Sequence, residues 1–386
     1  MKHCPVTSSD PTEHFNDILI AALTDVDLRS VPGHCTLNRL GSTNAQVLGL
    51  QPDGRFNLNN LRMIREVVWD RYSKLIAGEF ESDHLKVFVK PEPHKVKKLE
   101  EGRLRLIMSV SLVDSLVDRI LFIRLAYRVI ANYSKTGMMI GWSPLHGGYR
   151  QLNAIFGELD TVSIDKKAWD WSVPSWLLML VKRLIINLSP GAPDWWKRAV
   201  HGRFHCLFND PTFVFSDGTT GKQEKPGVMK SGCYLTLIIN SMAQLLLHYI
   251  VIEQMNMLPK EFDPIIVIGD DSLQKKNEHS GLYVKTLQSL GFRVEVEEHT
   301  AVREFAGFLY ERNSFVPAYK NKHRFLLERL PMDDKQLVKE TLASYQIIYY
   351  FDEEMLSIIH SIALALNIPE AITSRDALRS IVVDAN

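Results

Sequence analysis

Apolar and polar positions alternate along the chain in patterns that predict strands and helices in mixed order. Residues 85–89 and the stretches that end at Asp165 and Ile268 have strand patterns, and "PTFVFSDGTTGK" and "FAGFLYERNSFVPAYK" are typical of hairpins. Helical patterns run over residues 60–78, 111–130, 176–188 and 194–203, from Gly232, within "GLYVKTLQSLGF" and throughout the tail from Asp333. Because these segments do not repeat as strict strand-helix units, we expect an α+β core with helical flanks.

Residues 233–252, "CYLTLIINSMAQLLLHYIVI", have the length of a membrane span. Asn240, Gln244 and His248 recur every four residues within this stretch, which places polar groups along one face of a helix. We therefore expect a buried core helix with one functional face, and a chain with no membrane span of its own.

Composition indicates a globular protein but does not indicate what the protein binds. The 386 residues are 46% apolar and 23% charged, which is ordinary for a folded globular chain and argues against disorder or a fibrous repeat. The formal net charge is zero, so overall charge neither predicts nor excludes a nucleic-acid partner. Four scattered cysteines indicate a reducing compartment. The pairs His3/Cys4 and His34/Cys35 lack the usual spacing of zinc ligands, which leaves zinc as a minor alternative.

Two strand ends carry aspartates. "SIDKKAWD" places Asp165 at a strand end with Asp170 five residues later, and "PIIVIGDDSLQ" places Asp270 and Asp271 after a buried strand and Gly269. Adjacent carboxylates repel one another, and a shared divalent cation offsets that repulsion. Oxygen ligands favour Mg²⁺ or Mn²⁺, whereas an ordinary Gly-Asp-Asp turn is the structural alternative.

Between the aspartate segments lies "KSGCYLTLIINS". Ser231 and Gly232 form a flexible start to a helix, and Thr236 and Asn240 fall on the same helical face. A helix cap at Ser231 and a locally bonded buried amide at Asn240 are the structural alternatives.

The segment "KPEPHKVKKLEEGRLRLI" concentrates basic residues. Its prolines stiffen the backbone, and Arg103 and Arg105 alternate along a strand pattern, which favours a fixed phosphate-binding surface over a free tail. A solvated loop is the alternative.

Taken in order, these segments over residues 85–330 resemble the fingers and palm of a viral RNA-dependent RNA polymerase. The basic segment resembles the triphosphate-binding motif of that family, "SIDKKAWD" the first metal motif, "SGCYLTLIIN" the ribose-sensing motif and "IGDD" the second metal motif. "LGFRVE" and "EFAGFLY" resemble the later palm motifs. The amino-acid sequence of the basic segment is most similar to that of the polymerases of sobemoviruses and barnaviruses, which are positive-strand RNA viruses.

The resemblance implies a cupped right-hand fold with an antiparallel palm sheet flanked by helices. It places the fingers, with a fingertip region and the basic nucleotide segment, at 1–154 and 172–228, the palm at 155–171 and 229–310, and the thumb at 311–386. It implies template-directed RNA synthesis by two-metal nucleotidyl transfer, serving viral genome replication and transcription.

The site residues follow from the same resemblance. Asp165 and Asp270 are expected to bind two Mg²⁺ or Mn²⁺ ions with support from Asp271. The incoming nucleotide is expected to contact Lys90, Lys98, Arg103, Arg105, Asp170, Ser231, Gly232, Thr236 and Asn240. The chain departs from the family pattern after "LGF", where a lysine is common and "LGFRVEVEEHT" offers only Arg293 and His299. We expect His299 to be the proton donor, because histidine titrates near neutrality and arginine does not.

The implied partners are template and nascent RNA, ribonucleoside triphosphates, and a protein primer or other viral replication proteins. The expected location is the host-cell cytoplasm, at membrane-associated replication sites reached through partners. A reverse transcriptase would carry a bulky aromatic residue in place of Asp170. A two-metal nuclease or phosphatase is disfavoured because it needs neither the helix at 232–252 nor the arginines. A non-catalytic scaffold is disfavoured because it does not need both aspartate segments.

Overall fold

The computed structural model describes residues 3–94 and 96–384 and divides the chain into two compact units. The first unit comprises residues 1–132 and 167–248, and the second comprises residues 133–166 and 249–386. The boundary at 166/167 falls inside the "SIDKKAWD" segment, so Asp165 belongs to the second unit and Asp170 to the first. The predicted division into fingers, palm and thumb stays a prediction.

The first unit combines helices with a small sheet. Its strands are β1 (Leu85–Val89), β2 (Leu106–Ser109), β4 (Thr212–Val214) and β5 (Thr220–Lys222), in the order β2-β1-β4-β5, with β1 antiparallel to β2 and parallel to β4. Its helices are α1 (Pro11–Thr24), α2 (Asn44–Leu48), α3 (Leu58–Ala77), α4 (Val96–Glu100), α5 (Leu112–Ile130), α8 (Trp169–Ser172), α9 (Ser175–Asn187) and α10 (Asp194–Phe204). Helix α11 (Thr236–Gln254) begins here and ends in the second unit.

Helix ends in this unit follow from local sequence. The Asn57 side chain accepts hydrogen bonds from the first turn of α3, and Gly78 ends that helix in a left-handed conformation. The Ser111 hydroxyl caps α5 by accepting from the backbone N–H of Asp114 at 3.1 Å. These caps explain the observed bounds: α3 begins two residues and ends one residue before the predicted 60–78, and α5 begins one residue after the predicted Ser111.

A buried ionic network joins α3, α5 and α10. The Arg203 side chain donates to both carboxylate oxygens of Asp118, at 2.6 and 3.0 Å, and lies 3.6 Å from Asp114. The Arg71 guanidinium donates to Asp114 at 2.8 Å. Burial raises the pKa of Asp114 to about 6, although both arginines act in the opposite direction.

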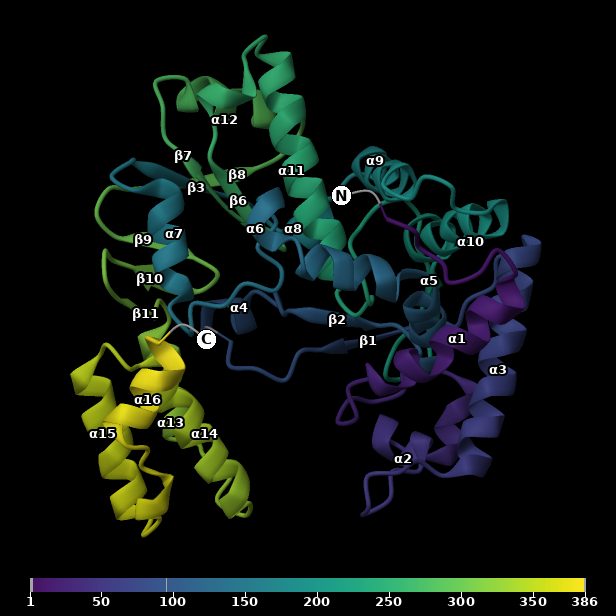
Figure 1. The fold of residues 1–386 in the computed structure, drawn as a ribbon, viewed down its shortest axis with the longest axis horizontal. Coiled ribbons are helices and arrows are strands. Elements are labelled where there is room, and N and C mark those ends of the chain that lie inside the picture. Colours follow the sequence, from purple (N-terminus) through teal and green to yellow (C-terminus); the bar gives the residue numbers. More distant parts are fainter. Residues whose placement is uncertain (1–2, 95, 385–386) are drawn as a thin grey trace. The chain divides into compact units, whose positions relative to one another are not determined.

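The second unit contains two sheets. The larger one is antiparallel, in the order β6-β7-β3-β8, and is formed by β3 (Thr161–Lys166), β6 (Ile265–Ile268), β7 (Asp271–Lys275) and β8 (Val294–His299) (Figure 1). The smaller one, in the order β11-β10-β9, consists of β9 (Arg303–Phe305), β10 (Phe308–Tyr310) and β11 (Phe315–Pro317). The helices are α6 (Tyr133–Thr136), α7 (Gly148–Phe156), α12 (Ser280–Ser289), α13 (Lys320–Leu327), α14 (Lys335–Ile348), α15 (Glu353–Ala365) and α16 (Arg375–Val382).

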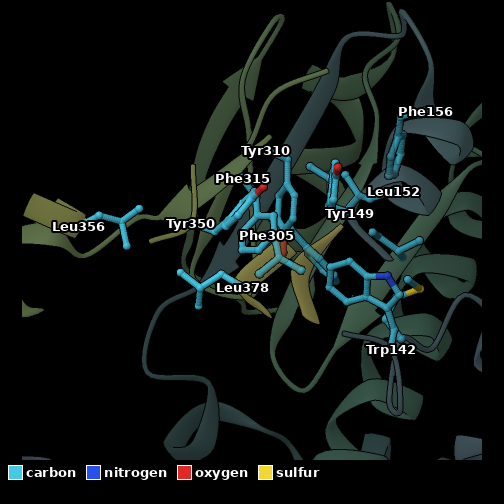
Figure 2. Packing of buried hydrophobic residues seen from close by; sticks show 14 residues of the cluster. Trp142, Tyr149, Leu152, Phe156, Phe305, Tyr310, Phe315, Tyr350, Leu356 and Leu378 are labelled. Atoms are coloured by element: carbon cyan, nitrogen blue, oxygen red, sulfur yellow. The ribbon is translucent and has the colours of Figure 1, made fainter. Parts of the chain in front are cut away.

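An aromatic core fixes the larger sheet within this unit. Ile266 of β6 and Leu273 of β7 belong to the same buried cluster as Tyr310, Phe315, Leu356 and Leu378, so this cluster connects both sheets with α15 and α16 (Figure 2). Burying one such phenylalanine stabilises the fold by about 1.5–3 kcal/mol. The hairpin of β6 and β7 is therefore anchored at its base and presents its tip to solvent.

The expected α+β class and the antiparallel sheet are confirmed, and three local predictions are corrected. Strand β3 ends at Lys166, one residue later than predicted. Arg103 and Arg105 precede β2 instead of alternating along it, because β2 begins at Leu106. The long helix begins at Thr236, since Gly232 forms a bridge with Ser109 and residues 233–235 form a bend and a turn. Helix α11 is long and apolar enough to cross a membrane, but 61% of its most apolar window is buried inside the protein, as in a core helix.

Candidate active site

The β6–β7 hairpin carries two of the predicted carboxylates at its tip. Ile268 pairs with Asp271, which leaves Gly269 and Asp270 as a two-residue loop. Gly269 adopts a positive φ of 63°, a conformation that costs glycine little and that a tight hairpin turn requires. The glycine thus permits the tight turn at which Asp270 and Asp271 lie.

Strand β3 brings the third carboxylate to the same edge of the sheet. Ser163 of β3 pairs with Leu273 of β7. Asp165 lies two residues after Ser163, and Asp271 lies two residues before Leu273. Because the strands are antiparallel, both aspartates lie toward the same end of the sheet. Antiparallel pairing therefore brings together residues that are 106 positions apart in the sequence.

One pocket of about 570 Å³ collects these side chains within the second unit. Its lining includes Asp165, Asp270 and Asp271, and all three residues are exposed to the open pocket. It also includes Glu295 and Glu297 of β8, Glu304 of β9 and Tyr319. The pocket is therefore strongly acidic, which suits cations and not a bare triphosphate.

The electrostatics of the pocket reflect this crowding. Although Asp271 is exposed to the pocket, desolvation by the surrounding protein raises its pKa to about 6, and repulsion from Asp270 and Asp165 acts in the same direction. Beneath them, the Lys166 ammonium donates to the Ile164 carbonyl at 3.0 Å and to the Ser272 hydroxyl at 3.2 Å. Burial lowers the pKa of Lys166 to about 8, while the three aspartates act to raise it.

The aspartates do not form a closed metal cage. Among residues 3–94 and 96–384, no group of three or more His, Cys, Asp or Glu side chains converges closely enough to hold a metal ion. Mg²⁺ usually binds through one or two carboxylates, with waters and substrate phosphates completing its octahedron. An open pocket with mutually repelling carboxylates fits that mode of binding, and Asp165, Asp270 and Asp271 would hold such ions.

Sequence reasoning missed the glutamates. The register of β3 against β8 places Glu295 opposite Asp165 and Glu297 opposite Ser163. Opposite residues of paired strands share a face, so the alternating acids of "RVEVEEH" project beside the aspartates. The alternation was visible in the sequence, but the pairing partner of the strand was not.

The structure does not bring His299 into this pocket. His299 pairs with Thr161 at the opposite end of β3 from Asp165, and its Nε2 atom lies 3.0 Å from the Ser163 hydroxyl. It is absent from the pocket lining and is buried. Burial also lowers the pKa of its imidazole, which disfavours the proton-carrying form. Its role as proton donor stays a prediction without geometric support.

A second group of predicted residues lies together in the first unit, around the loop before α11. The Ser231 hydroxyl accepts from the backbone N–H of Met108 on β2, at 3.1 Å. Gly232 forms a bridge with Ser109, and a Cβ atom there would lie 2.5 Å from the Met108 carbonyl oxygen. The Thr236 hydroxyl donates to the Lys230 carbonyl at 2.7 Å. Ser231 is therefore fixed by β2 and does not cap α11.

Asp170 and Asn240 are tied to the same loop. The Asp170 carbonyl of α8 accepts from the Met229 N–H at 2.7 Å. The indole Nε1–H of Trp169 donates to the Asn240 side-chain oxygen at 2.9 Å. The buried polar stripe predicted for the long helix is confirmed, since Asn240, Gln244 and His248 are all buried. No sequence pattern indicated the contact of Trp169 with Asn240.

The four basic residues of the nucleotide segment lie around the β1–β2 connection. The Lys90 N–H donates to the Arg105 carbonyl at 2.8 Å. Glu92 accepts from Arg105 at 3.0 Å and lies 3.3 Å from the Lys90 ammonium. Arg103 pairs with Glu101, and Lys98 lies on α4. The structure thus brings Lys90 and Arg105 together, and farther along the connection the Arg103 N–H donates to the Lys98 carbonyl at 2.8 Å.

Comparisons with known proteins agree with this arrangement. Residues 53–330 match the family model described as "Viral RNA-dependent RNA polymerase". "Protein P2-P3" of Poinsettia latent virus is 33% identical over 265 residues, covering 64% of this chain and 22% of that protein. "Replicase polyprotein P2AB" of Southern cowpea mosaic virus is 37% identical over 203 residues, covering 50% and 20%. "Protein P1-P2" of Turnip yellows virus is 32% identical over 299 residues, covering 68% and 26%.

A solved structure shows the same fold. The chain is similar to "Sicinivirus 3Dpol RNA dependent RNA polymerase", with a TM-score of 0.64, 15% sequence identity and coverage of 92% of this chain and 76% of that one. The chain spans about a quarter of the length of the curated relatives it matches.

Proposed function

Since the chain belongs to the viral RNA-dependent RNA polymerase family, we propose that it catalyses template-directed RNA synthesis. The reaction joins a ribonucleoside triphosphate to the 3′-hydroxyl of a growing RNA and serves viral genome replication and transcription. The observation that carries the proposal is the meeting of Asp165 from β3 with Asp270 and Asp271 from the β6–β7 hairpin at one pocket.

Divalent ions are part of the proposal. Asp165 and Asp270 would hold two Mg²⁺ or Mn²⁺ ions, with Asp271 beside them. When bound, such ions stabilise the negative charge on the attacking 3′-oxygen and on the departing pyrophosphate. The acidic lining of the pocket would otherwise repel the triphosphate, so the neutralisation of these carboxylates also permits the nucleotide to enter.

The basic residues are proposed to hold the triphosphate. Lys90 and Arg105 lie together and share Glu92, which keeps both cations in place before a nucleotide binds. A phosphate group competes with Glu92 for the same donors, because cations bind phosphate oxygens through charge-assisted hydrogen bonds. Lys98 and Arg103 would add charge from the same connection. Nucleotide binding should therefore weaken as salt concentration rises.

Asp170 and Asn240 are proposed to recognise the ribose. A 2′-hydroxyl both donates and accepts hydrogen bonds, so it can donate to a carboxylate and accept from an amide. Ser231, Gly232 and Thr236 form the loop that we expect to adjust as the nucleotide binds. An acidic residue at position 170 leaves room for the 2′-hydroxyl, which a bulky aromatic side chain would exclude.

The remaining parts of the proposal concern partners and place. The proposed partners are template RNA, nascent RNA, and a protein primer or other viral replication proteins. The proposed location is the host-cell cytoplasm, with membrane-associated replication sites reached through partners. Residues 1–154 and 172–228 are proposed as fingers, 155–171 and 229–310 as palm, and 311–386 as thumb.

Template-dependent incorporation of labelled ribonucleotides tests the proposal. We expect the purified chain to extend a primed heteropolymeric RNA template with Mg²⁺ or Mn²⁺, and to stop when EDTA removes the ions. Omission of the template should abolish the signal. Degradation of the template without extension would indicate a nuclease, and metal-independent RNA binding with no extension in either ion would indicate a scaffold.

A further inference from the structure

Trp169 makes a specific polar contact with a proposed ribose-recognition residue. Its indole Nε1–H donates to the Asn240 side-chain oxygen at 2.9 Å, and the two side chains are 2% and 5% exposed. Both residues belong to the first unit, Trp169 on the short helix α8 and Asn240 on α11. Trp169 has so far been assigned no role in the reaction.

The contact determines which end of the amide faces which neighbour. An indole N–H is only a donor, whereas an asparagine amide has an acceptor at one end and two donors at the other. With the amide reversed, an NH₂ group would face the indole N–H in a buried place, and neither donor would gain a partner. The indole therefore holds the Asn240 oxygen toward itself and turns the NH₂ group to the other side.

The position of Trp169 is itself well determined. Ala168, directly before α8, has a positive φ of 53°, which turns the chain into the helix. The Trp169 carbonyl accepts from the Val173 N–H at 3.0 Å. The next residue, Asp170, accepts from the Met229 N–H through its carbonyl at 2.7 Å. Trp169 and Asp170 are thus adjacent residues of one short helix that is bonded to the Ser231 loop.

We propose that Trp169 is a positioning residue for ribose selection: its indole N–H fixes the amide of Asn240 so that the NH₂ group is presented to the 2′-hydroxyl of the incoming nucleotide. The inference rests on the proposed polymerase function and deepens it. A ribonucleotide offers its 2′-oxygen to the amide and its 2′-proton to Asp170. A deoxyribonucleotide leaves both protein groups without that partner, which costs binding energy in the transition state.

Trp169→Phe removes the indole N–H and keeps an aromatic ring in the same place. The measurement is the ratio of kcat/KM for a ribonucleotide to that for the matching deoxyribonucleotide, on one primed RNA template. The loss of one hydrogen bond should lower this ratio by about 3- to 10-fold. Trp196→Phe is the matched control, because Trp196 is fully buried in the same unit and its indole N–H donates to the Leu121 carbonyl at 3.0 Å.

Two further variants separate the inference from its premise. Asn240→Ala should abolish the discrimination that the amide supplies, and the double variant with Trp169→Phe should discriminate no less than Asn240→Ala alone, since both changes act through one group. Asn240→Asp should also lose discrimination, because its carboxylate can still accept from Trp169 but cannot donate to a 2′-oxygen. Asn240→Asp needs no change at Trp169, so it tests the amide orientation even if Trp169→Phe does not fold.

The outcomes are distinct. A lowered ratio in Trp169→Phe with an unchanged ratio in Trp196→Phe supports the inference. If Trp169→Phe leaves the kcat/KM ratio unchanged while Asn240→Ala lowers it, the inference is overturned and the polymerase function stays intact. Full discrimination between ribo- and deoxyribonucleotides by Asn240→Asp also overturns the inference. So does an equal fall of the kcat/KM ratio in Trp169→Phe and Trp196→Phe. An absence of extension by the unmodified chain would instead count against the proposed function itself.

Discussion

Asp165 on β3 lies directly opposite Glu295 on β8. Like charges at opposite positions of paired strands are destabilising, so this pair costs stability in the free protein. Asp270 and Asp271 line the same pocket and add to the cost. This crowding of carboxylates is consistent with the proposed binding of divalent cations, which would offset their repulsion.

The opposed pair leads to a prediction for Glu295→Gln. Removal of one negative charge should raise the free energy of unfolding of the metal-free protein by about 0.2–1 kcal/mol. It should also raise the Mg²⁺ concentration needed for half-maximal extension, because the pocket attracts cations less strongly. Thermal unfolding with EDTA and a Mg²⁺ titration of extension measure the two effects. A variant that is less stable and needs no more Mg²⁺ would contradict this account.

Gly232→Ala should disturb the loop that precedes α11. A Cβ atom at this position would lie 2.5 Å from the Met108 carbonyl oxygen, so the loop has to move away from β2. We expect a loss of about 1–3 kcal/mol in the free energy of unfolding and a higher KM for nucleotides. Gly281→Ala is the control, because a Cβ atom there meets nothing within 4 Å and alanine favours the surrounding helix. Equal behaviour of the two variants would refute the proposed close approach.

The buried pair of Asp118 and Arg203 should dominate the stability of the first unit. Asp118→Ala leaves the Arg203 guanidinium without its two shortest hydrogen bonds in a buried place, which should cost about 3–5 kcal/mol. Asp210→Ala breaks an exposed pair with Lys222 and should cost about 1 kcal/mol or less. Urea unfolding compares them. Similar midpoints for both variants would show that the buried pair contributes no more than a surface pair.

Lys230 should make stability depend on pH. Its fully buried ammonium donates to the Gln223 side chain and to the carbonyls of Gly227 and Val228, at 2.8, 3.3 and 2.7 Å. Burial lowers its pKa from 10.5 to about 7. Between these values the unfolded chain binds more protons than the folded chain, so the contribution of Lys230 to the free energy of unfolding should rise as pH increases from about 7 toward 10.5.

Lys230→Met removes this contribution. Thermal unfolding in buffers from pH 7 to pH 9.5 should therefore show a steeper upward trend in the unmodified chain than in the variant. The fully buried Asp114, whose pKa is raised to about 6, titrates below this range and does not confuse the comparison. Parallel trends in the two proteins would show that Lys230 has the same affinity for protons in both states.

Local patterns were sufficient to predict most elements and the position of the hairpin carboxylates. Strand β1 matches residues 85–89, α5 follows its Ser111 cap, and the β6 strand ends at Ile268 as predicted. These features depend on nearby residues: a cap, a turn glycine or a run of apolar positions. The aspartates could be assigned to one site only because the family resemblance supplied the pairing of β3 with β7.

Long-range contacts could not be predicted in this way. Glu295 joins the pocket through the register of β8, and Trp169 meets Asn240 across 71 positions of sequence. No local pattern specifies either contact. The position of His299 was likewise not predictable: its chemistry suited a proton donor, but the sheet register places it at the far end of β3 from Asp165. Arg103 and Arg105 precede β2 because Leu106 starts the strand pairing.

The most direct test of the central claim compares Asp270→Asn with Asp53→Asn in primed RNA extension with Mg²⁺. Asparagine keeps the shape of aspartate and removes the charge that a divalent ion requires, and Asp53 is an exposed residue whose carboxylate lies 3.8 Å from Arg55. We predict that Asp270→Asn unfolds at the same temperature or higher and loses about a thousand-fold or more in extension rate, while Asp53→Asn keeps full activity. A well-folded Asp270→Asn variant that extends RNA at more than about a tenth of the unmodified rate would contradict the account.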